Sequence, residues 1–116
     1  MHPKSPKLLD DVLRSCQFIS EDAAGVTLDA YLHDRRMRQV VERNLGIIGE
    51  ALFRLRDIDP ETAEQITDLD QIIGLRNRLA HGYYEDIDDA LVWRAVQESL
   101  PILRGDVEKL MPEFEL

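Results

Sequence analysis

Apolar residues recur at spacings of three and four along most of this 116-residue chain, and this periodicity limits the chain to a helical fold. No segment shows the strict alternation of apolar and polar residues that a half-buried strand would require. The sequence therefore predicts an all-α fold, with residues 1–116 forming one domain and four to five helices packing as an antiparallel bundle. The clearest apolar positions are Leu9, Val12, Cys16 and Ile19, followed by Val41, Leu45, Ile48, Leu52 and Leu55.

Capping residues indicate where the helices begin and end. Gly25 ends the first helix, and a long central helix from Arg35 to Leu55 would span about 30 Å. The expected N-terminal signals, in chain order, are Ser5 before Pro6, Thr27 before a short helix to Leu32, Asp34, Pro60 in the first turn of another short helix, and Asp88.

The second half of the chain carries two further helices. One is expected from about Asp68 to His81-Gly82, with Ile72, Leu75 and Leu79 buried. The last helical segment follows Asp88 and is expected to be kinked or broken at Pro101. Its apolar positions are Leu91, Trp93, Val96, Leu100, Leu103, Val107 and Leu110.

Several helical stretches are apolar over more than one stripe. Val40-Val41, Ile47-Ile48 and Ala51-Leu52 are adjacent apolar pairs that cover a wide arc of the long central helix. Such an arc is explained either by a self-association face or by thorough burial in the core, and the sequence leaves both open.

The net charge and the single cysteine limit the classes of function and the cellular compartment expected for this protein. The formal net charge of −9 opposes general nucleic-acid binding, which usually uses a basic face. The net charge does not show how the charges are distributed along the chain, however. An arginine run at the start of the long central helix is either a solvated helix face or a local contact for RNA phosphates. A single cysteine, Cys16, excludes an intramolecular disulfide, and no signal or membrane-spanning segment is recognisable, so a cytoplasmic location is expected. The arginines of the run are Arg35, Arg36, Arg38 and Arg43.

The stretch GLRNRLAHGYYEDID, residues 74–88, places several hydrogen-bonding side chains at one expected helix end. Arg76 offers a planar charged fork suited to phosphate, and His81 can exchange a proton near neutral pH. Cleavage of RNA without a metal needs a base for the ribose 2′-hydroxyl, an acid for the leaving oxygen and positive charge on the developing phosphorane. One chain supplies one well-placed histidine, whereas a two-fold dimer would supply two histidines and two arginines.

A simpler explanation also fits these residues, because histidine and tyrosine near a helix C-terminus often just satisfy its last carbonyls. Other chemistries find less support in the sequence. The three histidines have no zinc-ligand spacing, and there is neither a glycine-rich phosphate loop nor a recognisable nucleophile motif. No metal and no cofactor are expected.

The segment RNRLAHGYY resembles the R-N-x-x-x-H-x-Y signature of the HEPN-domain toxins of the HepT family. VVERNLGIIGEAL, DIDDALVW and LPIL are also similar to segments of that family, so the resemblance extends from about Leu8 to Leu110. It implies a HEPN-like helical domain that forms a two-fold homodimer. It also implies a metal-independent endoribonuclease toxin of a type II/VII-like toxin–antitoxin pair, with Arg76 and His81 as the catalytic pair and Asn77 as a supporting residue.

The resemblance further implies how such a toxin would be silenced. The antitoxin of this family is a small nucleotidyltransferase resembling MntA, which transfers AMP to the motif tyrosine, and that tyrosine matches Tyr83. AMP there would place a bulky anion where RNA phosphate must lie. Tyr84 is expected to pack at the loop. Glu50, a polar residue in an apolar arc, needs a partner if buried, and we expect it to hold Arg76 or Asn77 in place.

Two rival functions belong to other classes. The chain could be a non-catalytic helical adaptor of a minimal nucleotidyltransferase, with the motif serving as a docking and modification surface. It could also be a structural dimer whose motif residues only cap a helix. Loss of RNA cleavage on replacing His81 would separate the enzyme from both.

Overall fold

The computed structural model describes residues 1–81 and 87–111, and for residues 80 and 81 it describes the main chain alone. These residues form helices joined by short connections, with no strand among them, so the predicted all-α class is confirmed. The helices are α1 (Ser5–Ala23), α2 (Leu28–Leu32), α3 (Arg35–Ile58), α4 (Pro60–Ala63), α5 (Leu69–His81), α6 (Asp89–Arg94) and α7 (Leu100–Leu110).

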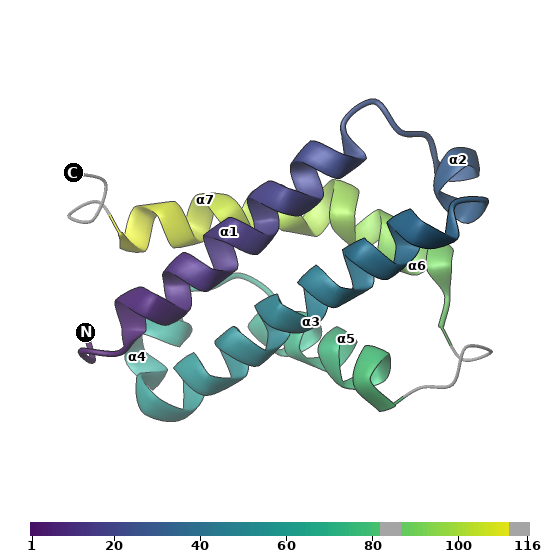
Figure 1. Cartoon of the computed structure of the whole chain (residues 1–116). Helices are drawn as coiled ribbons and strands as arrows, with labels where there is room; N and C mark the ends of the chain where they lie inside the picture. Colours follow the sequence, from purple (N-terminus) through teal and green to yellow (C-terminus); the bar gives the residue numbers. More distant parts are fainter. Residues whose placement is uncertain (82–86, 112–116) are drawn as a thin grey trace.

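The two longest helices form the centre of the molecule. In Figure 1, α1 and α3 lie side by side and run in opposite directions, with α6 and α7 behind them. The helix α5 packs on the side of α3 remote from α1 and then diverges from it. The described part of the chain contains no helix long and apolar enough to cross a membrane.

Most of the predicted caps are confirmed. The side chains of Thr27, Asp34 and Asp88 accept hydrogen bonds from main-chain N–H groups three residues further on, at 3.1, 3.0 and 3.1 Å. Pro60 occupies the first turn of α4, also as expected. These signals are readable from the sequence because a cap contacts only its own helix.

The predicted cap at Ser5 is wrong. Lys4 precedes the first helical residue and Ser5 lies inside α1, where its side chain is buried. Its hydroxyl donates to Asp59 Oδ2 at 2.7 Å, at the far end of α3. The Ser5 hydroxyl therefore binds a carboxylate that is distant in the sequence and does not cap its own helix.

The core follows the predicted stripes on α1 and α3. All nine apolar positions expected there are buried, including Cys16, and burial raises the pKa of the Cys16 thiol to about 12. On α5 the prediction is shifted, because Ile73 is the buried residue while Ile72, Leu75 and Leu79 are half-buried. Leu91, one of the apolar positions of the last segment, is 41% exposed.

The wide apolar arc of α3 is divided between core and surface. Val41, Ile48, Ala51 and Leu52 are buried, whereas Val40 and Ile47 are 41% and 39% exposed. The exposed pair lies seven residues apart and therefore on one line of the helix.

The last segment does not break at Pro101. The chain stays helical from α6 into α7 through a π-helical turn at Ala95–Ser99, just before the proline. Proline cannot donate the hydrogen bond that would continue a regular α-helix, and a single wider turn is a common way to accommodate such a loss.

Candidate active site

A glycine fixes where α3 and α5 cross. Gly49 is buried in the middle of α3, and a Cβ atom at this position would overlap with Cβ and Cγ of Arg76 on α5. The two helices can approach this closely only because residue 49 has no side chain. The close approach places Arg76 directly beside the polar residue that follows Gly49.

That residue is Glu50, and it binds Arg76. Glu50 Oε2 accepts a hydrogen bond from Arg76 Nη2, within an ion pair whose side chains are 39% and 27% exposed, respectively. Arg76 Nη1 also donates to Oδ1 of the adjacent Asn77 at 2.6 Å. The contact expected between Glu50 and Arg76 is thus present, and three of the predicted site residues meet at the helix crossing. Their part in a reaction stays a prediction.

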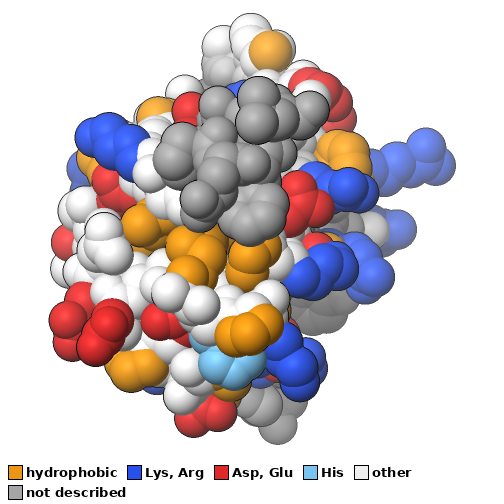
Figure 2. Space-filling view, turned by 90° about the vertical axis from the view of Figure 1, so that its left-hand side faces the viewer, with side chains coloured by type: hydrophobic (Ala, Val, Ile, Leu, Met, Phe, Trp, Pro, Cys, Tyr) orange, Lys and Arg blue, Asp and Glu red, His pale blue; other side chains and the backbone are white. Residues whose placement is uncertain are grey.

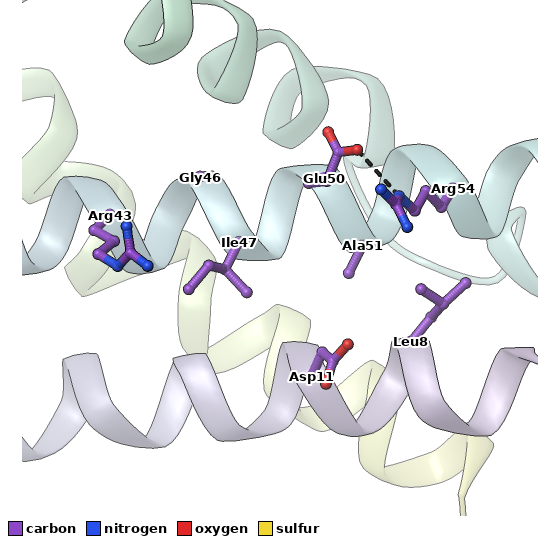
Figure 3. Close-up of a pocket in the computed structure, with 8 residues that line it drawn as sticks. All are labelled: Leu8, Asp11, Arg43, Gly46, Ile47, Glu50, Ala51 and Arg54. Atoms are coloured by element: carbon purple, nitrogen blue, oxygen red, sulfur yellow. Dashed lines mark hydrogen bonds and ion pairs between the residues drawn. The ribbon is translucent and has the colours of Figure 1, made fainter.

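Glu50 is held from a second direction by its own helix. Its Oε1 accepts from Nε of Arg54, one turn further along α3, at 3.1 Å. Figure 3 shows this contact and shows Ile47 and Ala51 pointing toward α1, whereas Glu50 points away from it. The hydrogen bond from Arg54 and the charges of Arg54 and Arg76 lower the pKa of Glu50, so the carboxylate stays ionised in its bridging position.

The four arginines of the predicted RNA-contact run separate in space. Arg43 lines a surface groove between α1 and α3 together with Glu50 and Arg54 (Figure 3). Arg35 and Arg36 are exposed in the first turn of α3, about 22 Å along the helix from Glu50. Only Arg43 of these three therefore lies near the candidate site.

Arg38 has a structural task. It donates to the carbonyl oxygen of Leu32 at 2.7 Å, and its Nε lies 3.6 Å from Asp89 Oδ2. The side chain thereby joins the C-terminal end of α2 to the first turn of α6, and it is only 22% exposed. A contact between Arg38 and RNA stays a prediction, and these intramolecular contacts weaken it.

The remaining motif residues are only partly described. His81 is the last residue of α5, five residues after Arg76 and so about 7.5 Å further along the helix axis, but its ring lies outside the described residues. Tyr83 and Tyr84 also lie outside them. The structure therefore describes the arginine side of the candidate site and the main-chain position of His81.

Charge is unevenly distributed on the surface despite the net value of −9. On the face in Figure 2, most Lys and Arg side chains lie to the right, some of them beside acidic side chains, and a further group of acidic side chains lies at the lower left, apart from them. A locally basic region can therefore coexist with an acidic chain.

Sequence reasoning missed two residues of the site, Gly49 and Arg54. The Arg54 contact was readable from its spacing, because a glutamate followed four residues later by arginine commonly forms a pair on one helix face. Nothing local distinguishes Gly49 from Gly46, since the difference between them comes from α5.

This difference yields a matched pair of substitutions. Gly49→Ala is expected to destabilise the protein by about 1–2 kcal/mol, because overpacking against Arg76 outweighs the gain in helix propensity. Gly46→Ala meets no atom within 4 Å and is expected to stabilise by about 0.5–1 kcal/mol. Urea unfolding of both variants checks this, and equal effects at the two positions would contradict the close crossing.

An all-helical domain that presents a firmly held arginine and an asparagine, with a histidine five residues further on, is the kind of protein that can bind and act on a phosphate ester. Comparison with protein families agrees with this class. The model of the family "Ribonuclease HepT-like" matches residues 12–110. The chain therefore belongs to the HepT-like ribonuclease family, and ribonuclease is the enzyme class of that family.

Individual relatives match over nearly their whole length. "Putative RNase MJ1380" of Methanocaldococcus jannaschii is 32% identical over 102 residues, covering 86% of this chain and 90% of that protein. "Probable ribonuclease HepT" of Thermococcus cleftensis is 28% identical, covering 88% and 91%. "Putative RNase TTE0752" of Caldanaerobacter subterraneus subsp. tengcongensis is 26% identical, covering 93% and 96%.

Proposed function

We propose that this chain is a metal-independent endoribonuclease toxin that cleaves RNA at a site shared by two protomers. The observation that carries the proposal is the arrangement around Arg76. Glu50 and Asn77 both bind its guanidinium, and His81 follows on the same helix. A charged fork held in one orientation is suited to a phosphate whose charge grows during the reaction.

The proposed reaction divides its tasks between these side chains. A histidine takes the proton of the ribose 2′-hydroxyl, the 2′-oxygen attacks the adjacent phosphorus, and the 5′-oxygen leaves after it receives a proton. Arg76 stabilises the added negative charge on the phosphorane. Base and acid must be two separate groups, and two protomers supply one His81 each.

Self-association is supported by the exposed apolar residues on α3. Val40 and Ile47 lie on one line of the helix and remain on the surface of the isolated chain. Surface apolar residues that lie together on one face commonly mark a protein contact. A two-fold homodimer would cover them if this line faces the partner.

Control of the enzyme is proposed to act through Tyr83. A nucleotidyltransferase antitoxin resembling MntA would transfer AMP to its hydroxyl, two residues after His81. The added phosphate carries negative charge, and the nucleoside is bulky, so the modified protein would repel and exclude RNA.

The testing experiment is cleavage of total and transfer RNA by the purified protein in EDTA, with the intact mass recorded. Wild-type protein of unmodified mass is expected to cleave, and His81→Ala is expected to lose cleavage because the proton-transfer group is gone. His33→Ala is the matched control, since His33 is an exposed histidine at the C-terminal end of α2. No cleavage by unmodified wild-type protein would favour the adaptor function. A mass raised by whole adenylyl groups would identify the silenced form, and Tyr83→Phe should prevent that rise.

The shared site is tested in the same assay by mixing wild-type protein with His81→Ala protein. A heterodimer of the two keeps one His81 and lacks either the base or the acid, so excess His81→Ala subunits should lower the activity of the wild-type protein after subunit exchange. Wild-type activity that is unchanged by exchange with excess His81→Ala subunits would count against a shared site.

A further inference from the structure

An aromatic side chain is exposed next to the candidate site. Phe53 lies on α3, three residues after Glu50, and is 44% exposed. The Cζ atoms of Arg56 and Arg76 lie 5.6 and 5.9 Å from the centre of its ring. These distances are at the outer limit of a cation–π contact, and the 44% exposure of the side chain leaves part of the ring accessible to a ligand.

Two ion pairs beside the ring join the helices α3 and α5. Arg56 Nη1 binds Asp70 Oδ1 on α5 at 2.8 Å, and Arg76 on α5 binds Glu50 on α3. Phe53 therefore lies between two ion pairs that each connect α3 with α5. Asp70 is 87% exposed, and an ion pair this open contributes little stability, so Arg56 can turn to an incoming phosphate at small cost.

Phe53 is separate from the apolar line that we assign to self-association. Ile47 and Val40 lie on one side of α3, whereas six residues of helix rotate Phe53 by about 120° from Ile47. Arg56 and Arg76 both lie within 6 Å of the ring centre, and no other large exposed apolar residue of α3 shares its side. The ring is therefore not surrounded by other large exposed apolar residues of α3, whereas the centre of a protein contact is usually apolar over a wider area.

The combination matches the way proteins bind unpaired nucleotides. Bases that are not paired stack on aromatic side chains, while arginines neutralise the flanking phosphates. Within one nucleotide the base and the phosphate are joined through a single ribose. Phe53 and Arg76 are close enough to hold these two parts of the same or the next nucleotide.

We propose that Phe53 is a stacking site for an unpaired base beside the phosphate held by Arg76, so that the substrate is single-stranded RNA. This inference rests on the proposed ribonuclease function and adds the substrate class. It predicts that a base-paired region must open, or that the enzyme selects loops and single-stranded ends, because a base inside a duplex cannot reach the ring.

The experiment measures binding without cleavage, using a fluorescently labelled single-stranded RNA whose 2′-hydroxyls are all methylated. Blocking the 2′-oxygen removes the attacking group and leaves bases and phosphates available. Phe53→Ala is expected to raise Kd by about 5- to 150-fold, the range found for removing one base stack. Phe53→Trp should bind at least as tightly as wild type, and Phe53→Leu should resemble Phe53→Ala although it keeps an apolar side chain.

The matched control is Phe18→Ala, because Phe18 is an exposed phenylalanine (53%) on α1. It should leave Kd unchanged. Urea unfolding confirms that each variant is folded, and sedimentation gives the oligomeric state. Wild-type affinity in Phe53→Leu together with a loss in Phe53→Ala would overturn stacking in favour of a simple apolar contact. A binding loss that appears only when the oligomer dissociates would assign Phe53 to a protein interface and overturn the proposal.

Cleavage of unmethylated RNA in EDTA separates failure of this inference from failure of the proposed function. If wild-type protein cleaves and Phe53→Ala has unchanged Kd and KM, the stacking site is wrong and the ribonuclease stands. If unmodified wild-type protein binds the methylated RNA through Phe53 but cleaves nothing, the ribonuclease proposal fails while the stacking site survives. Absence of any binding by the wild-type protein overturns the stacking site.

Discussion

Arg76→Ala is expected to lower kcat/KM for RNA cleavage by about 10³-fold while leaving the protein folded. Removing one group that stabilises the charge of a transition state typically costs this much, and phosphoryl chemistry depends strongly on arginine. The loss of the Glu50 ion pair should cost at most about 1 kcal/mol of stability, because both side chains are partly exposed and Glu50 keeps its bond to Arg54. Steady-state cleavage in EDTA and urea unfolding measure the two effects separately.

Comparison variants show which property of Arg76 matters. Arg76→Lys keeps the charge and loses the planar fork, so activity between wild type and Arg76→Ala is expected. Glu50→Gln removes the charge that orients Arg76 and should reduce cleavage less than Arg76→Ala does. Arg14→Ala, which removes an exposed ion pair with Asp10 on α1, is the control. Activity of Arg76→Ala within a few-fold of wild type would exclude a direct part for Arg76 in the reaction.

Asp59→Ala is expected to destabilise the protein by about 3 kcal/mol, the largest stability effect we predict. Asp59 is buried where α3 ends and α4 begins, and its carboxylate binds residues at the N-terminal end of the chain. Its Oδ2 accepts from the hydroxyls of Ser5 and Thr62, both at 2.7 Å, and from the main-chain N–H of His2 at 3.0 Å. Replacing Asp59 by alanine leaves two buried hydroxyls without this acceptor.

Asp34→Ala is the matched control for Asp59→Ala. Asp34 also precedes a helix, but it is exposed and its side chain accepts one bond, from Met37 N. A cap of this kind contributes about 1 kcal/mol. Chemical denaturation of both variants gives the comparison, and a loss at Asp59 no larger than that at Asp34 would contradict the buried cluster.

The same cluster predicts a dependence on acid. Hydrogen bonds from Thr62, Ser5 and His2 hold the pKa of Asp59 well below its usual 3.8 in the folded protein. The unfolded chain therefore takes up the proton first as the pH falls. The stabilisation is fully present above the unfolded pKa and is lost as the pH drops below about 4. Unfolding free energies from pH 6 to pH 3 should fall more steeply for wild type than for Asp59→Asn.

The sequence by itself determined the local structure of this protein. Thr27, Asp34, Asp88 and Pro60 mark helix starts through contacts within their own helix, and the three-and-four spacing identified the buried face of α1 and of α3. These features depend on neighbours within about one helical turn, so the order of residues contains them. The Arg76-to-His81 motif was also visible from residue order, as a set of side chains suited to phosphate chemistry.

Tertiary structure decided everything that joins distant segments. Glu50 and Arg76 are 26 residues apart in the sequence, and Ser5 and Asp59 are 54 apart. Both contacts depend on which helices pack together and on which residues of each helix face one another. The same reason explains why Gly49 is confined while Gly46 is open, and why Ile73 is buried in place of Ile72. Periodicity predicts that a helix has an apolar face, but only the packing of α5 against α3 determines which of its residues meet the core.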